Sequence, residues 1–397
     1  MYLTPYEESL LEGEEGEAVR RAMRLLVTLG EVFDAPRLIE VRSTHISGVS
    51  YMNLGDAGLG FLEEQAEIGA KTRVRATLNP AGMDLKRWKA LGVPRSFAEK
   101  QLRVVSAFKG MGIEPSCTCT PYLAGNKPEL GEQIAWAESS AIAYSNSVLG
   151  ARTNRETGPT TLASTVTGRA PFYGYRISEN RKPTGMVEVE APVRSDLEFS
   201  LLGYVIGAQI KNGVPYIRHL NVTSTEDLKA LGASAATSGG VALYHIESST
   251  PESDSFSLEY LSNLERFKVD RNLLNETLVS LSSEVKSPII CLGCPHCSLF
   301  EMQRIAGLLE GHRLERRLWV FTSRKVYAEA RRRGLVNAIE HAGGRVFTDT
   351  CMVVAPLEEM GVQEVSTNSC KAAQYLANRR INVALGPMDQ LLKEVTG

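Results

Sequence analysis

Cysteines are the side chains of this 397-residue sequence that are best suited to metal chemistry. Six of the seven stand at expected strand ends or loops: Cys117 and Cys119, then Cys291, Cys294 and Cys297, and finally Cys351. Thiolates that come together from separate loops are typical ligands of metals, above all of iron–sulfur clusters. The seventh, Cys370, is expected to be a buried structural thiol.

Other thiol sites each lack part of their usual pattern here. A structural zinc site takes two pairs of ligands, and no second Cys-x-x-Cys pair or His-x-x-x-His pair is present. A ferredoxin-type carrier has a fourth cysteine three residues on, whereas Cys297 is followed by Ser298, Leu299 and Phe300. Cysteines that are simply buried remain a further alternative. The pattern favours an iron–sulfur cluster.

Composition is typical of a cytoplasmic enzyme. The chain exceeds one ordinary domain, and a hydrophobic content of 43% is ample for one or two large cores. A net charge of -2 argues against a nucleic-acid partner. The acidic start is unlike a signal peptide, and no apolar run is long enough to span a membrane. An odd number of cysteines without secretory context fits a reducing compartment.

The last third of the chain alternates between short apolar runs and helical patterns. The apolar runs are residues 287–293, 317–322, 345–348 and 381–386, and the helical patterns are residues 299–309, 326–341 and 372–378. Such alternation predicts a parallel sheet with crossover helices. Ligands of such sheets bind beyond the carboxyl ends of the strands, which is where Cys291, Cys294 and Cys351 are expected.

The first two thirds are less regular. Helices are expected over residues 5–29, 97–110 and 130–148, and strands over residues 37–41 and 72–78. A polar connection at residues 247–255 marks a composition shift. We therefore expect an α/β protein with a substrate-site region over 1–250 and a doubly wound domain carrying cluster ligands over 251–397.

Two polar clusters in the first region suggest a binding site. Residues 138–156 set small hydroxyls in a helix that leads into a loop with paired arginines and asparagines. This density fits a site for an anionic, hydroxylated ligand, although small residues also allow close helix packing. His45 follows a strand and could position a ligand or a proton, although a lone histidine is often structural.

Five segments together carry a resemblance to a known family. Residues 45–51, 77–84, 117–122, 138–156 and 347–356 resemble the large subunit of aconitase X, and the likeness extends over essentially the whole chain. One departure is Thr157, where the family pattern has a second glycine beside Gly158. The resemblance implies an aconitase-like fold without the swivelling domain, and a hydro-lyase activity.

The resemblance also implies a cofactor and a partner. Aconitase relatives hold a [4Fe-4S] cluster through three cysteines and leave one iron open to the substrate. A separate small subunit would supply the swivelling domain and a serine base. The implied cluster ligands are Cys117, Cys294 and Cys351, while Cys119, Cys291 and Cys297 stay open as alternatives.

The motifs that match the family suggest individual roles. Implied catalytic residues are His45, Ser47 and Glu138. Implied substrate-binding residues are Asn79, Ser139, Ser140, Arg152, Asn154, Arg155, Asn368 and Lys371.

Two substrates occur among members of the family. Archaeal-type members dehydrate mevalonate 5-phosphate to trans-anhydromevalonate 5-phosphate, and bacterial members dehydrate cis-3-hydroxy-L-proline. The segment from Asn79 to Asp84 resembles the archaeal pattern and favours the phosphorylated hydroxy acid. Hydroxyproline is the alternative substrate, and a non-catalytic iron–sulfur scaffold subunit is the alternative of another class.

Overall fold

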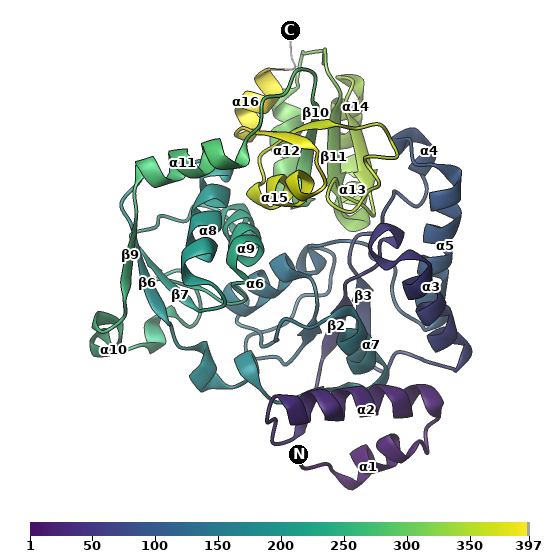
Figure 1. Ribbon diagram of the computed structural model, residues 1–397. Coiled ribbons are helices and arrows are strands. Elements are labelled where there is room, and N and C mark those ends of the chain that lie inside the picture. The colour runs from purple at the N-terminus through teal and green to yellow at the C-terminus, as the bar shows by residue number, and fades with distance from the viewer. Residues whose placement is uncertain (395–397) are drawn as a thin grey trace.

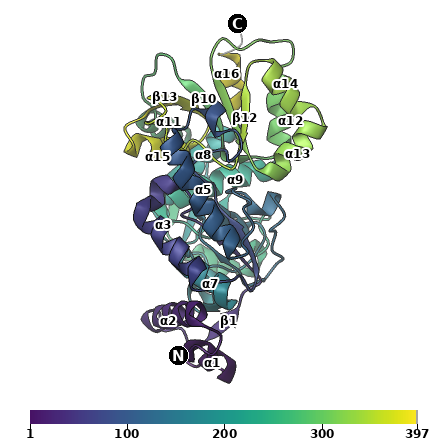
Figure 2. The same ribbon diagram turned by 90° about the vertical axis from the view of Figure 1, so that its right-hand side faces the viewer.

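Three parallel sheets with their own helices organise residues 1–394, the part of the chain that this computed structural model describes. In Figure 1 the N-terminal unit lies at the lower right, the middle unit at the left and the C-terminal unit at the top. Figure 2, turned by 90°, shows the first two helices and the C-terminal unit at opposite ends. The arrangement confirms the predicted α/β class with several parallel sheets.

The first sheet has the order β3-β2-β4 and carries one of the polar clusters. Its strands are β2 (Ser43–Ile46), β3 (Arg75–Leu78) and β4 (Ala135–Trp136), and a separate antiparallel pair joins β1 (Leu38–Glu40) to β5 (Arg169–Pro171). Its helices are α1 (Pro5–Glu12), α2 (Glu17–Val32), α3 (Tyr51–Glu67), α4 (Trp88–Leu91), α5 (Arg95–Gly110), α6 (Ser139–Ser147) and α7 (Gly158–Thr167). His45 pairs in register with Thr77 on one side and Trp136 on the other, so the three strands end close together.

The second sheet has the order β8-β7-β6-β9. Its strands are β6 (Gly185–Val189), β7 (Pro215–Arg218), β8 (His245–Ile246) and β9 (Arg266–Val269). Its helices are α8 (Asp196–Ile210), α9 (Thr225–Gly239), α10 (Leu258–Ser262) and α11 (Arg271–Leu281). The polar connection at residues 247–255 leads from β8 towards β9, and β9 pairs with β6, so this segment lies inside the second unit.

The third sheet has the order β12-β11-β10-β13-β14, and all its pairs are parallel. Its strands are β10 (Ile289–Cys297), β11 (Leu318–Thr322), β12 (Arg345–Thr348), β13 (Glu364–Thr367) and β14 (Asn382–Leu385). Its helices are α12 (Leu299–Leu308), α13 (Arg324–Arg332), α14 (Leu335–His341), α15 (Cys370–Asn378) and α16 (Met388–Lys393). The predicted alternation of strands and crossover helices is confirmed.

Two of the predicted helices are divided at glycines. The helix expected over 5–29 splits because Gly13 adopts a φ of 95° and closes α1 with a left-handed cap. The helix expected over 326–341 splits in the same way at Gly334, where φ is 78°. Periodicity alone does not reveal such breaks, since the apolar residues on either side continue the helical spacing.

The segment from 130 to 148 is also not one helix. It contains β4 first, and α6 begins only after Glu138, whose side chain accepts a hydrogen bond from the backbone of Ser140. A carboxylate at this position caps the helix and satisfies an amide that would otherwise lack a partner. The cap fixes where the helix starts, and therefore which way Glu138 points.

The first unit packs directly on one face of the third sheet. Met83 and Phe97 are buried in the same apolar cluster as Trp319, Phe321 and Phe347 of the third unit. Helices α12, α13 and α14 cover the opposite face of that sheet. This shared core holds the two sheets in a fixed relation. Within residues 1–394 no helix has both the length and the apolar character that crossing a bilayer requires.

Gly293 allows β10 and β11 to approach each other just before Cys294. Its φ is 106°, and a Cβ atom there would lie 2.1 Å from the carbonyl oxygen of Phe321. The pairing of β10 with β11 shifts register between Leu292 and Cys297. The chain therefore leaves the regular ladder at the point where Cys294 is presented.

We expect Gly293→Ala to lower the free energy of unfolding by roughly 2–5 kcal/mol, because left-handed strain adds to overlap with backbone. Urea unfolding followed by circular dichroism measures the loss. Gly307→Ala is the control, since Gly307 lies inside α12 with nothing within 4 Å of the added methyl. The free energy of unfolding of Gly307→Ala should rise by about 0.5–1 kcal/mol. A urea midpoint for Gly293→Ala equal to that of the native protein would contradict the expected loss of stability.

Candidate active site

One pocket of about 260 Å³ lies where the first and third sheets meet at the carboxyl ends of their strands. It is lined by loops that follow β2, β3, β4 and β12, by Cys294 and Pro295 of β10, by the loop that carries Cys119, and by residues near the starts of α3 and α15. In open parallel sheets this edge is where ligands bind. Its polar and thiol-bearing lining residues are Ser47, Asn53, Asn79, Cys119, Glu138, Ser139, Cys294, Cys351, Lys371 and Tyr375.

A larger surface hollow of about 710 Å³ lies at the opposite, amino ends of the strands in the first sheet. None of the residues that line it belongs to the sites expected from the sequence. The smaller pocket is therefore the candidate active site, because the predicted residues converge there and not in the larger hollow.

Three thiols share the candidate pocket. The exposed fraction is 7% for Cys119 and 5% for Cys351, and Cys294 is half-buried. The remaining cysteines are at most 1% exposed and lie in the cores: Cys117, Cys291, Cys297 and Cys370. Two predicted ligands, Cys294 and Cys351, are thus brought together.

Cys119, and not Cys117, is the thiol from the third segment that reaches this pocket. Cys117 is buried in the core of the first unit. In a regular strand residues two apart point to the same face, so the sequence could not separate these two cysteines. The φ of Cys117 is 44°, which breaks the alternation and turns the two side chains to different surroundings.

Burial raises the pKa of all three pocket thiols. The pKa of Cys119 rises to about 12 because of burial first and then the negative charge of Glu138. Burial likewise raises the pKa of Cys294 and that of Cys351, and the neighbouring thiols add to the effect at Cys351. A bound metal would take the place of these protons, since the thiolate is the ligand.

The donor set fits an iron–sulfur group. Thiolates are the ligands that such clusters use, and all three come from separate segments that line one pocket. Among residues 1–394, no three histidine, cysteine, aspartate or glutamate side chains are arranged around a position for one metal ion. The fit therefore rests on the thiol type and on the shared pocket.

A buried ion pair lies beside the thiols. The Nζ atom of Lys371 is 2.5 Å from Oε1 of Glu138, and their side chains are only 9% and 11% exposed. Ser140 supports the same carboxylate, since its hydroxyl donates to Oε1 at 2.6 Å. Burial alone would raise the pKa of Glu138, but the charge of Lys371 and these hydrogen bonds outweigh it and lower the value to about 2. Glu138 is therefore a carboxylate at neutral pH.

His45 lies behind this pair and is fully buried. Its Nδ1 atom is 2.8 Å from the hydroxyl of Thr77, and its Nε2 atom has no hydrogen-bond partner among the described residues. Burial lowers the pKa of His45 to about 4, although Glu138 and Asn79 oppose the shift. The imidazole is therefore neutral at pH 7. Asn79 donates to Oε2 of Glu138 at 3.1 Å and connects the pair with the neighbourhood of His45.

Ser47 lines the pocket at the end of β2. The start of α7 packs against its backbone, since a Cβ atom on Gly158 would lie 2.9 Å from the carbonyl oxygen of Ser47. Thr157, the departure from the family pattern, caps α7 by accepting a hydrogen bond from the amide of Thr160. The threonine thus fixes the helix start without entering the pocket lining.

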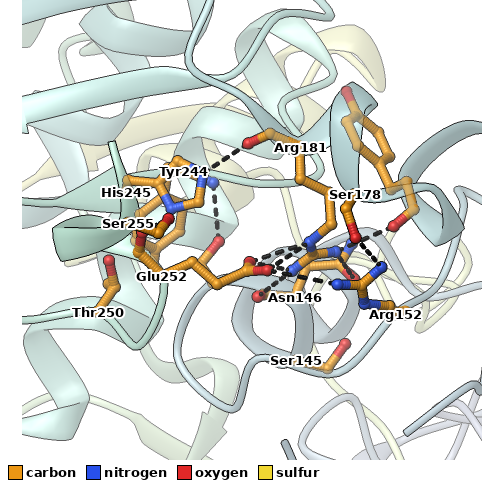
Figure 3. A network of polar contacts seen from close by, with 12 residues as sticks. Ser145, Asn146, Arg152, Ser178, Arg181, Tyr244, His245, Thr250, Glu252 and Ser255 are labelled. Carbon is orange, nitrogen blue, oxygen red and sulfur yellow. Dashed lines mark hydrogen bonds and ion pairs between the residues drawn. The ribbon is translucent and has the colours of Figure 1, made fainter. Parts of the chain in front are cut away.

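Arg152 does not line the pocket. Figure 3 shows its side chain directed towards Ser178, and its Nη1 atom donates to the Ser178 hydroxyl at 2.9 Å. The other guanidinium nitrogen lies near Glu252, which also pairs with the buried Arg181. The contact with Glu252 connects the first unit to the second, so Arg152 has a structural role here.

The other predicted residues of this loop are also engaged elsewhere. Asn154 donates to the carbonyl oxygen of Tyr173 at 3.1 Å, and the exposed Arg155 donates to the side chain of Asn212 at 3.0 Å. Neither belongs to the pocket lining. The proposed use of this loop for substrate binding stays a prediction without a contact to support it.

Asn368 lies next to the pocket but opens on a separate small cavity. That cavity has a volume of about 20 Å³ and shares Cys294 with the main pocket. Asn368 donates its amide hydrogen to the carboxylate of Asp196. Asn368 therefore supports the structure next to Cys294 and does not line the main pocket.

Two lining residues were not expected from the sequence. Tyr375 stands four residues after Lys371 on α15, and it is 40% exposed. Residues four apart lie on one face of a helix, so Lys371 could have indicated Tyr375. Asn53 lies in the first turn of α3, which the sequence did not identify as a helix. Nothing in its neighbourhood marked it.

Family models match nearly the whole chain. Residues 1–179 match the aconitase X first domain, residues 183–278 the second domain, and residues 287–397 the third domain. Within the described residues these limits agree with the three sheet-based units. The boundary expected near residue 250 falls inside the second of them.

Individual proteins match over nearly all of this chain. The phosphomevalonate dehydratase large subunit of Methanocaldococcus jannaschii is 47% identical and covers 99% of this chain and 100% of its own. The cis-3-hydroxy-L-proline dehydratase of Pseudomonas aeruginosa is 36% identical, over 96% of this chain but 68% of its own. A crystal structure of Thermococcus kodakaraensis aconitase X in its holo-form superimposes with a TM-score of 0.94 at 42% identity, covering 100% of both chains.

We expect Lys371→Met to lower the free energy of unfolding by about 3–5 kcal/mol at neutral pH, because it leaves Glu138 buried without its partner. In the native protein the lowered pKa of Glu138 makes its contribution fully present above the ordinary carboxyl pKa, and the contribution is lost as pH falls towards 2. In the variant, burial should raise that pKa. The variant should therefore lose stability as pH rises from about 5 to 8.

Urea unfolding at several pH values measures both effects. Lys268→Met is the matched control, because Lys268 forms an exposed ion pair with Glu190 and should contribute little. Equal losses in the two variants, or a loss for Lys371→Met that does not grow with pH, would contradict the role of the buried pair.

Proposed function

The chain belongs to the aconitase X family, and we propose that it is the large subunit of a hydro-lyase that dehydrates (R)-5-phosphomevalonate to trans-anhydromevalonate 5-phosphate. The observation that carries this proposal is a pocket shared by three thiols and a buried Glu138–Lys371 pair. Support for the substrate comes from identities of 37–47% to relatives that bear this name, against 34–36% to hydroxyproline dehydratases. A mere iron–sulfur scaffold would have no use for the ion pair.

The proposed cofactor is a [4Fe-4S] cluster held by Cys119, Cys294 and Cys351. This set keeps two of the three ligands inferred from the sequence and takes Cys119 in place of Cys117, because Cys119 lines the pocket. When bound, an open iron of such a cluster supplies a Lewis acid that stabilises a departing hydroxide. Residues of the chain then have to bind the carboxylate and manage the proton.

Lys371 is the proposed carboxylate ligand. Glu138 favours its protonated form, and burial strengthens the attraction between the ammonium and an anion. When the proton leaves C2 of the substrate, negative charge grows on the adjacent carboxylate, and a fixed cation stabilises it. The hydroxyl of Ser139 adds a neutral donor on the same side.

His45 and Glu138 orient other groups in this proposal. A neutral imidazole with a pKa of about 4 is a poor base at pH 7, and so is a carboxylate with a pKa of about 2. Ser47 and Asn79 stand where they can donate hydrogen bonds to the substrate. The base that takes the C2 proton comes from a small partner subunit in this scheme. We place the enzyme in the cytoplasm, where thiols stay reduced.

The substrate assignment is tested with both subunits purified anaerobically. We expect dehydration of mevalonate 5-phosphate, and a loss of roughly 2–4 kcal/mol in kcat/KM when the phosphate is removed, because a charged group loses its partners. Product formation is followed by mass spectrometry and proton NMR. Efficient turnover of cis-3-hydroxy-L-proline would instead support the alternative substrate, and the absence of turnover of either would favour the scaffold.

The ligand assignment is tested by cysteine variants. Cys119→Ser should abolish the visible absorption of the reconstituted cluster and the activity, since serine is a poor substitute for a thiolate. Cys117→Ser should retain the cluster, because this residue lies in the core two positions away. Iron and sulfide analysis gives the readout. The reverse result would restore Cys117 as the ligand.

A further inference from the structure

His296 connects the three thiol-bearing segments. It follows Cys294 by two residues, and it is fully buried. Its Nε2 atom lies 2.8 Å from the carbonyl oxygen of Thr350, next to Cys351 in the chain. Its Nδ1 atom lies 3.0 Å from the hydroxyl of Thr118, next to Cys119. One imidazole thus bridges neighbours of two pocket cysteines and belongs to the segment of the third.

The hydrogen-bond partners define the protonation of the ring. The carbonyl oxygen of Thr350 only accepts, so Nε2 carries the hydrogen and donates it. Nδ1 of the neutral ring is then an acceptor, and the Thr118 hydroxyl donates to it. Both ring nitrogens are therefore used in one defined tautomer.

The backbone of His296 adds two further contacts. Its N–H donates to the sulfur of Cys119 at 3.2 Å, and its carbonyl oxygen accepts from Nζ of Lys229 at 3.0 Å. Lys229 belongs to α9 in the second unit and also pairs with Glu301. The residue is therefore held from all three units of the described chain.

The other two buried histidines lack this saturation. Nε2 of His45 and Nδ1 of His245 have no hydrogen-bond partner among residues 1–394. His245 makes one ring contact of the same type, from Nε2 to the carbonyl oxygen of Arg181 at 2.8 Å. It does not line the pocket and contacts no thiol-bearing segment, which makes it a suitable control.

We propose that His296 is a positioning residue that holds Cys119, Cys294 and Cys351 in the arrangement that binds the cofactor, an inference that rests on the ligand set proposed above. Cys119 and Cys351 lie on loops, and Cys294 lies where β10 shifts its register against β11. Such irregular segments have many conformations unless further contacts hold them. Hydrogen-bonding groups around metal ligands commonly contribute roughly 10–100-fold to metal affinity. His296 supplies such hydrogen-bonding groups to the loops that carry Cys119 and Cys351.

The decisive variants are His296→Leu and Thr118→Val, made in the full chain. His296→Leu removes both ring bonds. Thr118→Val removes the hydroxyl that donates to Nδ1 and that also accepts the N–H of Thr120 at 3.1 Å. We expect iron release from the reconstituted cluster to a chelator to become roughly 10–100-fold faster in His296→Leu and to rise less in Thr118→Val. Thr118→Ser, which keeps the hydroxyl, should restore the native rate.

Two controls separate positioning from general stability. His245→Leu cuts a comparable buried bond and should leave iron release unchanged. Urea unfolding of the metal-free proteins shows whether the His245 and His296 variants lose similar stability. If His296→Leu does not fold, the test is the comparison of iron release between Thr118→Val and Thr118→Ser. Native iron release in both His296→Leu and Thr118→Val would overturn the proposal.

Cadmium binding to the metal-free chain separates this inference from the proposed function. Cd²⁺ binds thiolates in pairs as well as in threes, so it does not require three thiols already arranged around one ion. Cadmium bound by the pocket thiols should show sulfur-to-metal charge-transfer absorption, and His296→Leu should weaken that binding by a similar factor. Cadmium binding that depends on His296, in a chain that builds no iron–sulfur cluster, would refute the proposed cofactor and keep the positioning role. A cluster that forms equally well in the native chain and in His296→Leu would support the proposed cofactor and refute the positioning role. The absence of cadmium binding in the native chain would overturn both.

Discussion

The ion pair of Glu138 and Lys371 is the constraint on which the site depends, because two charges are buried where two structural units meet. Removing such charges from water is costly, and the cost is offset only when their geometry is maintained. The pair requires α6 to begin where it does and α15 to approach it end-on. The shared apolar core around Phe97 and Phe347 supplies the rigidity for that requirement. The pocket thiols lie next to this ion pair, so the position of the pair helps to define where the thiol-bearing segments lie.

Much of the fold could be predicted where one period dominates the sequence. The third unit has short apolar runs between helical patterns, and four of its five strands were expected on that basis. The fifth, β13, reads Glu-Val-Ser-Thr and carries no apolar run, so its buried position depends on neighbours that no local pattern reports. In the first unit, Gly13 and the cap at Glu138 divide stretches whose hydrophobic spacing continues across the break. Periodicity describes faces of elements and says little about where they end.

The site was predictable in its location but only partly in its members. Cys294 and Cys351 could be expected together because they follow strands of one parallel sheet. The choice between Cys117 and Cys119 depended on a single backbone angle, which residue types do not encode. The loop from Arg152 to Arg155 has the composition of an anion site, yet its two arginines contact Glu252 and Asn212 of the second unit. Composition indicates what a side chain can do, while tertiary contacts determine what it touches.

The involvement of all three units around His296 has a consequence for biosynthesis. Cys119 is made early, whereas Cys294 and Cys351 follow only in the last third of the chain, and Lys229 must already be in place between them. Domains of a growing polypeptide fold largely in order from the N-terminus. If Cys119, Cys294 and Cys351 are the ligands as proposed, a nascent chain that contains only the first and second units offers one of the three thiols. On that proposed ligand set, the complete site forms only after the third unit has been synthesised.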